Sequence, residues 1–343
     1  MKKLLNTLYI TLPDAYLGLK GENVAIIKDE VIIGRVPLHN LEAICTLGRQ
    51  GASPALMSAC VERDISITFL STSGRFRARV IGPTKGNVTL RRSQYRLADD
   101  EAKSAQVSKH FLIGKIYNSK WSLERVTRDH ALRIDLEKFK SKSAFLSESI
   151  KQLAAADNLE VLRGIEGNAA NAYFSVMDDM ILQQKDAFFY KGRSRRPPLD
   201  NVNALLSFVY TLLASDVGAA LETVGLDPYV GFLHRDRPGR MSLALDVMEE
   251  LRSVYADRFV LSVINKKQVK ATDFLKKESG AVIMTDNARK EILQLWQKRK
   301  DEQITHPFLK EKISWGLVPH AQAILLARFL RGDLDAYPPF LWK

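Results

Sequence analysis

The chain has 343 residues, 46% apolar and 26% charged, which allows a sizeable core and argues against a disordered protein. Its 51 Lys and Arg against 39 Asp and Glu give a net charge of +12, typical of nucleic-acid partners but also of ordinary basic enzymes. Two cysteines exclude a disulfide framework, and the most apolar stretch, 204–214, is shorter than the roughly 20 residues of a membrane helix. We therefore expect a cytoplasmic protein with no membrane partner.

Residues 1–82 have the pattern of a small strand-rich domain, with short β-branched and aromatic runs separated by turn signals. Strands are expected over residues 8–11, 15–19, 24–27, 31–33, 65–70 and 75–80, the last two joined by a turn at 71–74. Ser53 followed by Pro54 predicts the start of a helix that ends at Arg63.

Residues 83–98 are rich in Gly, Pro, Lys and Arg and are predicted to form a linker. Beyond them nearly every stretch has helical periodicity, over residues 100–126, 129–140, 148–155, 159–183, 203–221, 243–263, 286–299 and 320–332. The expected fold class is α+β, with a small N-terminal β-rich, β-sandwich-like domain (1–82) followed by a larger all-helical domain (99–343).

Glu166 lies in a helical stretch of unusually small residues, with Gly164 and Gly167 on either side of it. Each glycine inside a helix costs about 1 kcal/mol relative to alanine, so something must offset that cost. Tight helix packing and access to a functional site are equally good explanations at this point.

His234 stands out among the six histidines because it lies in a charged turn rich in Gly and Pro between two helical stretches. Ser242 then offers an N-cap for a helix that carries Asp246, Glu249 and Glu250. In projection Glu249 lies opposite the apolar stripe, so periodicity favours a solvated acidic face. Carboxylates near a histidine also provide the ligands that Mg²⁺ or Mn²⁺ require.

A basic, Pro-containing loop is predicted at 191–198, where Arg193, Arg195 and Arg196 follow three aromatic residues. Such a loop suits phosphates and an unpaired base, although a solvated loop over a helix end has the same composition. No phosphate-binding glycine loop, nucleophile elbow or Cys/His zinc spacing is present, which disfavours a nucleotide-hydrolysing motor and a serine hydrolase.

Four stretches together resemble the CRISPR-associated integrase family, the large subunit of the spacer-acquisition machinery, and most closely its subtype I-C branch. They are Gly164-Ile165-Glu166-Gly167 with Ala169-Ala170 and Tyr173-Phe174, then Arg193–Pro198 leading to Asn203–Ser207, then Gly231-Phe232-Leu233-His234, and finally Ser242–Glu250. Their order and spacing match as well, and the resemblance covers essentially the whole chain.

The resemblance implies a bound Mg²⁺ or Mn²⁺ held by Glu166, His234 and Glu249. Many relatives carry Asp where this chain has Glu249, and Asp246 is the family's accompanying acid, which would assist the catalytic residues. Arg193, Arg195, Arg196 and Arg240 are candidate contacts to DNA phosphates. Because a histidine must be neutral to bind a metal, we expect activity to fall at acid pH.

The implied function is a metal-dependent endonuclease and integrase of CRISPR adaptation, which joins the 3′-hydroxyl ends of short DNA duplexes to a repeat array by transesterification. The implied partners are double-stranded DNA, a second copy of the chain joined through the β-rich domain, and a dimer of a small adaptation protein. Two other hypotheses are a metal-dependent DNA nuclease without integration and a non-catalytic DNA-binding scaffold.

Overall fold

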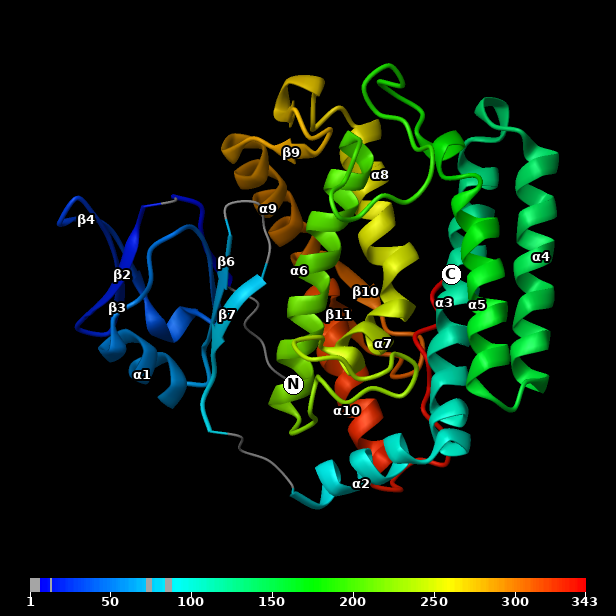
Figure 1. The fold of residues 1–343 in the computed structure, drawn as a ribbon, viewed down its shortest axis with the longest axis horizontal. Coiled ribbons are helices and arrows are strands. Elements are labelled where there is room, and N and C mark those ends of the chain that lie inside the picture. The colour runs from blue at the N-terminus through cyan, green and yellow to red at the C-terminus, as the bar shows by residue number, and fades with distance from the viewer. Residues whose placement is uncertain (1–6, 13, 72–75, 84–87) are drawn as a thin grey trace.

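The computed structural model describes residues 7–12, 14–71, 76–83 and 88–343, and it has a strand-rich N-terminal region and a larger, mainly helical C-terminal region (Figure 1). The predicted α+β class is confirmed. The chain start, most of the predicted turn at 71–74 and the first residue of the predicted strand 75–80 lie outside the described residues.

The N-terminal region is built from two sheets and one helix. Its elements are β1 (Thr7–Ile10), β2 (Tyr16–Lys20), β3 (Asn23–Lys28), β4 (Val31–Pro37), β5 (Ala43–Leu47), α1 (Pro54–Glu62), β6 (Ser66–Leu70) and β7 (Phe76–Val80). The strands β2, β3 and β4 form an antiparallel sheet, and β1, β5, β6 and β7 form a second sheet in that order. Leu17, Leu56 and Ile67 show that both sheets and α1 share one apolar core.

Ser53 caps α1 as predicted, since its hydroxyl oxygen accepts from the Leu56 backbone N–H at 3.2 Å. The strand β5, however, was not predicted. It pairs in parallel with both β1 and β6 and is mostly buried, so it lacks the alternation of polar and apolar residues that marks a half-exposed strand. Cys45 in β5 and Cys60 in α1 are both buried and unpaired, as predicted.

The C-terminal region contains long helices and two short hairpins. Its helices are α2 (Val88–Asp99), α3 (Glu101–Asp129), α4 (Leu136–Ala155), α5 (Leu159–Phe174), α6 (Asn201–Thr223), α7 (Ser242–Leu251), α8 (Arg258–Asn265), α9 (Asp286–Asp301) and α10 (Val318–Leu330). Its strands are β8 (Phe274–Lys276), β9 (Val282–Met284), β10 (Gln303–Thr305) and β11 (Lys312–Ser314). The hairpins β8–β9 and β10–β11 correct the prediction of an all-helical domain, because strands of three residues are too short to show a period in the sequence.

Several predicted boundaries also differ from the structure. The helices predicted at 129–140 and 148–155 are one helix, α4, and the helix predicted at 159–183 ends at Phe174 as α5. Residues 88–98 of the predicted linker are part of α2, whose basic and polar residues suit an exposed helix as well as a linker. The predicted helix over 243–263 begins as α7, continues through a π-helical segment at Arg252–Asp257 and ends as α8. π-helical segments are rare and occur frequently at functional sites.

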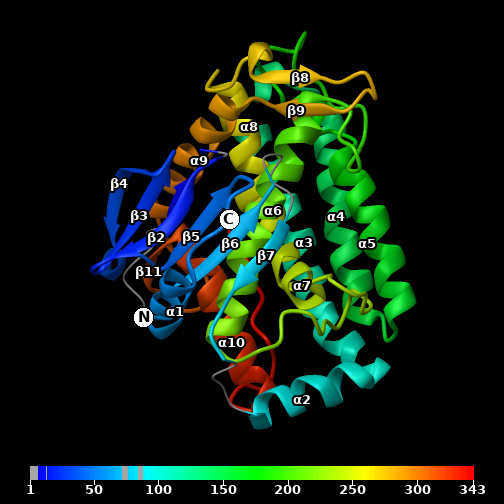
Figure 2. The ribbon, with the colours of Figure 1, turned by 60° about the vertical axis from the view of Figure 1, so that its left-hand side comes forward.

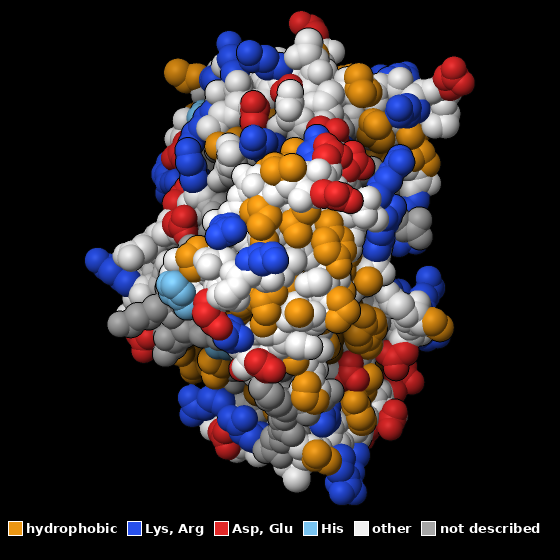
Figure 3. All heavy atoms as spheres, turned by 90° about the vertical axis from the view of Figure 1, so that its left-hand side faces the viewer, with side chains coloured by type: hydrophobic (Ala, Val, Ile, Leu, Met, Phe, Trp, Pro, Cys, Tyr) orange, Lys and Arg blue, Asp and Glu red, His pale blue; other side chains and the backbone are white. Residues whose placement is uncertain are grey.

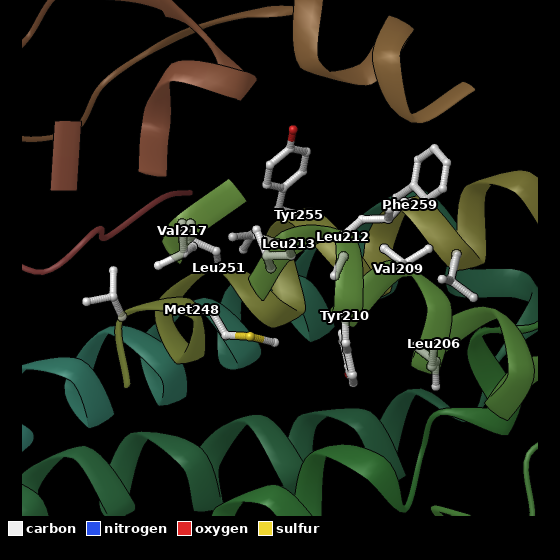
Figure 4. Close-up of a cluster of buried hydrophobic side chains, with 14 of the residues drawn as sticks. Leu206, Val209, Tyr210, Leu212, Leu213, Val217, Met248, Leu251, Tyr255 and Phe259 are labelled. Carbon is white, nitrogen blue, oxygen red and sulfur yellow. The ribbon is translucent and has the colours of Figure 1, made fainter. Parts of the chain in front are cut away.

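The helix α6 forms the centre of the C-terminal core. Figure 4 shows Leu213 and Val217 of α6 beside Met248 and Leu251 of α7, and all four side chains are buried. By length and composition α6 is also able to cross a membrane, but 67% of its most apolar window is buried within the protein. Packing in the core explains its apolar sequence, which extends beyond the stretch 204–214.

The arrangement of the helices positions the acidic residues. The helices α3, α4 and α5 pack side by side at the far side of the C-terminal region from the sheets (Figures 1 and 2). The helix α7 contacts α6 on one side and α3 on the other. Its polar side is therefore covered by α3 rather than exposed to solvent.

Candidate functional site

A lysine joins two of the predicted site residues. The ammonium of Lys115, in the middle of α3, forms an ion pair with Glu166 of α5 and lies 2.7 Å from Oε2 of Glu249 of α7. The Lys115 side chain is only 13% exposed, so it is held largely out of solvent between the two carboxylates. The fold thus brings Glu166 and Glu249 to the same cation.

Glu249 is buried, and its carboxyl group is held in the ionised form. Burial alone would raise the pKa of its carboxyl group, but the charges of Arg252, Lys115 and His234 outweigh burial and lower the pKa to about 2. Its Oε1 accepts from Arg252 at 2.6 Å. Its buried Oε2 lies 2.7 Å from the Lys115 ammonium. An oxygen in this position is suited to contact a cation.

His234 is held by the carboxylate of Asp246. The His234 Nδ1 lies 2.6 Å from Asp246 Oδ1, and the same carboxylate accepts the backbone N–H groups of Phe232, Leu233 and His234 at 2.7–3.0 Å. Asp246 is fully buried, whereas 29% of the His234 side chain is exposed. A hydrogen bond from Nδ1–H to Asp246 leaves Nε2 with its lone pair, the usual arrangement for a metal-binding histidine.

Gly231 allows the turn to approach α7 this closely. A Cβ atom at this position would lie 2.8 Å from Oδ2 of Asp246 and 2.9 Å from the backbone carbon of Ser242, so any other residue would push the turn away. The predicted N-cap at Ser242 is wrong, because Ser242 is the first residue of α7 and Met241 precedes it without a side-chain cap. The Pro228 carbonyl accepts the Leu243 N–H instead, at 3.0 Å.

The favoured expectation of a solvated acidic face on α7 is also wrong. Asp246 and Glu250 are fully buried, and Glu249 is 4% exposed. Glu250 packs against Gly114 of α3 and accepts from Gln322, from the Tyr337 hydroxyl and from the Phe340 backbone N–H. The helix is covered on both polar flanks by segments more than 70 residues away in the sequence.

The glycines beside Glu166 face open space. A Cβ atom at Gly164 or Gly167 would have no neighbour within 4 Å, so tight helix packing does not explain them. Access to a site is the explanation that remains. The backbone of α5 is bare at both glycines, which lie two residues before and one residue after Glu166.

The four arginines proposed to bind phosphates have different environments. Arg195 and Arg196 are exposed, as expected of a phosphate-binding loop. Arg193 is half-buried and donates to Asn203 at 2.7 Å and Ser207 at 3.1 Å, so it fastens the loop to α6. Arg240 donates to Ser242 and to the Arg235 carbonyl and fastens its own turn in the same way.

Only part of the aromatic run before this loop is available for stacking. Phe188 and Tyr190 are buried in the core, and Phe189 alone is substantially exposed, at 38%. The lysine Lys191 lies over the Phe189 ring, 5.3 Å from its centroid. At most one ring of the three therefore offers a face to an unpaired base.

Two functional residues were missed from the sequence, Lys115 and Arg252. The residue Arg252 pairs with Glu249 and lies over the ring of Tyr210, 4.4 Å from its centroid. Its spacing of three residues from Glu249 on a helix was a usable signal. Lys115 had none, because it is 51 residues from Glu166 and lies within an otherwise unremarkable long helix.

The described residues contain no group of three His, Cys, Asp or Glu side chains close enough to hold a metal ion in this arrangement. Instead the Lys115 ammonium occupies the space between two of the proposed ligands. The donor set nevertheless fits a hard divalent cation, with two carboxylate side chains and an imidazole oriented through its Nδ1.

The fold is one that solved Cas1 structures share. The Cas1 protein from Thermotoga maritima matches with a TM-score of 0.82 at 20% identity, over 97% of this chain and 99% of that chain. A casposase bound to integration product matches with a TM-score of 0.83 at 19% identity, over 98% of this chain and 93% of that chain. A Cas6-RT-Cas1–Cas2 complex contains a chain that matches with a TM-score of 0.81 at 22% identity, over all of this chain and 36% of that chain.

Sequence similarity defines the family. The family described as CRISPR associated protein Cas1 matches residues 8–298. The CRISPR-associated endonuclease Cas1 1 of Chlorobaculum tepidum is 51% identical over 343 residues, and the CRISPR-associated endonuclease Cas1 2 of Rhodospirillum rubrum is 50% identical over 347 residues. Both matches cover the full length of each chain. The chain therefore belongs to the Cas1 family.

Proposed function

We propose that this Cas1 protein is a cytoplasmic, metal-dependent DNA endonuclease and integrase of CRISPR adaptation, of subtype I-C, which joins 3′-hydroxyl ends of short duplexes to a repeat array. One observation carries the proposal. Two carboxylates from separate helices, Glu166 of α5 and Glu249 of α7, contact the same cation, and α7 also carries Asp246, which holds His234. A scaffold that only binds DNA has no use for such a cluster.

Glu166, Glu249 and His234 Nε2 are the proposed ligands of Mg²⁺ or Mn²⁺. When bound, the ion would polarise the target phosphate and favour the deprotonated 3′-oxygen. Asp246 keeps the His234 proton on Nδ1, and Arg252 keeps Glu249 ionised. The exposed arginines Arg195 and Arg196 bind phosphates of the DNA, while Arg193 and Arg240 keep the two neighbouring turns in place.

The proposed partners are double-stranded DNA, a second copy of the chain and a dimer of the small adaptation protein. The casposase and the Cas1–Cas2 complex that share this fold support DNA and Cas2 as partners. Figure 3 shows hydrophobic side chains gathered on the face that the N-terminal region presents. Val31 and Ile33 of β4 are 62% and 50% exposed, which supports a homodimer through this region.

Strand joining tests the proposal directly. The protein, with its small partner, is incubated with a repeat-containing plasmid and a labelled duplex in Mg²⁺, in Mn²⁺ or in EDTA. We expect joined product only with a metal, and loss of at least roughly 100-fold in Glu166→Gln and His234→Ala. The exposed Glu148 of α4, changed to Gln, is the control and should retain activity.

The same assay distinguishes the other hypotheses. Cleavage without joining, with and without the small partner, would indicate a plain nuclease. Equal joining in EDTA, or undiminished joining in both site variants, would contradict the metal site itself.

A further inference from the structure

Lys115 fills the space where the proposed metal would bind. Its ammonium contacts Glu166 and lies 2.7 Å from Glu249 Oε2. Its exposed fraction of 13% means that it has lost most of its hydration, which only close negative charges can offset. No other residue described in the structure forms an ion pair with both of these carboxylates.

The two carboxylates need a cation between them. Glu249 is 4% exposed, and the Glu166 carboxylate that shares its Lys115 partner would repel it across a region of low dielectric. Arg252 neutralises only the Oε1 side of Glu249. Without Lys115 or a metal, the facing oxygens would have no counter-charge.

The Lys115 side chain borders a small cavity. This cavity of about 20 Å³ is also lined by Ser119, Ala169, Ala170, Arg252 and Asp257. This volume is enough for about one water molecule, or a group of that size such as an ammonium. The small side chains of Ala169 and Ala170 leave this space next to the Lys115 chain.

We propose that Lys115 is an internal counter-ion, which holds Glu166 and Glu249 together in the metal-free protein and withdraws when a divalent cation binds between them. The inference rests on the proposed metal site. It implies that Lys115 competes with the metal, so the metal-free protein is more stable and the metal affinity lower than they would be without the lysine. The Lys115 contacts to the two carboxylates thus stabilise the site while it holds no metal.

Mn²⁺ binding to the full-length, DNA-free protein, measured by calorimetry, tests this competition. Lys115→Met keeps most of the side-chain length and removes the charge. We expect its dissociation constant for Mn²⁺ to fall by roughly tenfold, within the range of ordinary coupling energies. Its melting temperature should fall in EDTA and recover when Mn²⁺ is added. Lys120→Met, on the same helix and beside Trp121, is the matched control and should bind Mn²⁺ as the natural protein does.

Failure of the counter-ion proposal and failure of the proposed metal site give different results. Unchanged or weaker Mn²⁺ binding by Lys115→Met would overturn the counter-ion proposal while leaving the metal site intact. If Lys115→Met does not fold, Lys115→Arg tests the proposal instead. A guanidinium is too large for the cavity, so this variant should bind Mn²⁺ more weakly. Unchanged Mn²⁺ binding by Lys115→Arg would overturn the proposal. Absence of Mn²⁺ binding by the natural protein, or equal binding by Glu166→Gln, would instead contradict the proposed function.

Discussion

Glu249 and Glu250 are adjacent on α7, but their carboxyl pKa values are shifted in opposite directions. On the side facing α3 and α5, Arg252, Lys115 and His234 overcome the effect of burial and lower the Glu249 pKa to about 2. On the side facing the C-terminal residues, burial raises the Glu250 pKa to about 8, and neutral hydrogen-bond donors only partly oppose it. Both side chains are almost completely buried. The difference therefore comes from their partners, which are cations on one side and neutral donors on the other.

The two polar sides of α7 are therefore suited to different roles. The Glu249 side keeps a charged carboxylate, which contacts the cations Lys115 and Arg252. The Glu250 side is closed by Tyr337 and Phe340 and fixes the helix in position. The first side is suited to bind a cation and the second to support it.

The largest expected effect is the difference in activity between two single variants, Glu249→Gln and Glu250→Gln. Glu249→Gln should lower strand cleavage and joining by at least roughly 100-fold, because it removes a proposed ligand charge. Glu250→Gln keeps an acceptor oxygen and should stay within about tenfold of the natural protein. Rates are compared on protein whose circular dichroism shows a native fold, since Glu249→Gln also leaves Arg252 without its carboxylate. Similar losses in both variants would remove the distinction between the two sides.

Asp246→Asn should have the next largest effect. An amide in place of the carboxylate can donate to His234 Nδ1, which moves the ring proton to Nε2 and blocks the proposed ligand atom. We expect Mn²⁺ affinity to fall by roughly 10- to 100-fold, as measured by calorimetry. Unchanged affinity would show that His234 is not a ligand.

A smaller effect is expected in the pH dependence of stability. Native Glu250 keeps a proton up to a pKa of about 8, whereas in the unfolded chain it loses that proton near its ordinary value of 4.5. Its contribution to the free energy of unfolding is thus complete below pH 4.5 and lost as the pH rises to 8, on the order of a few kcal/mol.

Urea unfolding at several pH values in EDTA measures this loss. Glu250→Gln should flatten the decline between pH 4.5 and 8. Glu249 has the opposite sign, because its lowered pKa gives stability above pH 4.5 that is lost only as the pH falls toward 2. A decline that persists unchanged in Glu250→Gln would exclude Glu250 as its source.

The smallest expected effect concerns the exposed loop. Arg195→Ala and Arg196→Ala should each weaken DNA binding only a few-fold and reduce the slope of log affinity against log salt by about 1. Arg193→Ala should instead lower the melting temperature, because it removes hydrogen bonds to Asn203 and Ser207. Filter binding at several salt concentrations separates the two kinds of arginine, and equal salt slopes in all three variants would contradict the division.

Local features of the fold were predictable from the sequence, and distant contacts were not. The start of α1 at Ser53 and the mainly helical C-terminal region follow from local signals. The burial of Glu249 could not be predicted, since α3 covers it from more than 130 residues earlier in the chain. Periodicity describes one helix at a time, so it assigns a polar side to solvent even when another helix carries the matching charge.

The site residues show the same limit. His234 was indicated by its turn, and the resemblance to the integrase family linked it to Glu166 and Glu249. Lys115 needed the structure, because nothing in its neighbours distinguishes it from any other lysine in a long helix. The different tasks of Asp246 and Glu249 also became visible only through their hydrogen bonds.

The bare backbone at Gly164 and Gly167 has a thermodynamic consequence. A methyl group at either position would touch nothing, and alanine would stabilise a helix by about 1 kcal/mol per site. The chain therefore gives up roughly 2 kcal/mol of fold stability within one helix. That is a substantial fraction of the 5–15 kcal/mol that typically separates a folded domain from its unfolded state. Under the proposed function, α5 gives up this stability for clearance near Glu166, and a variant with alanine at both positions would be more stable but would bind its substrate less well.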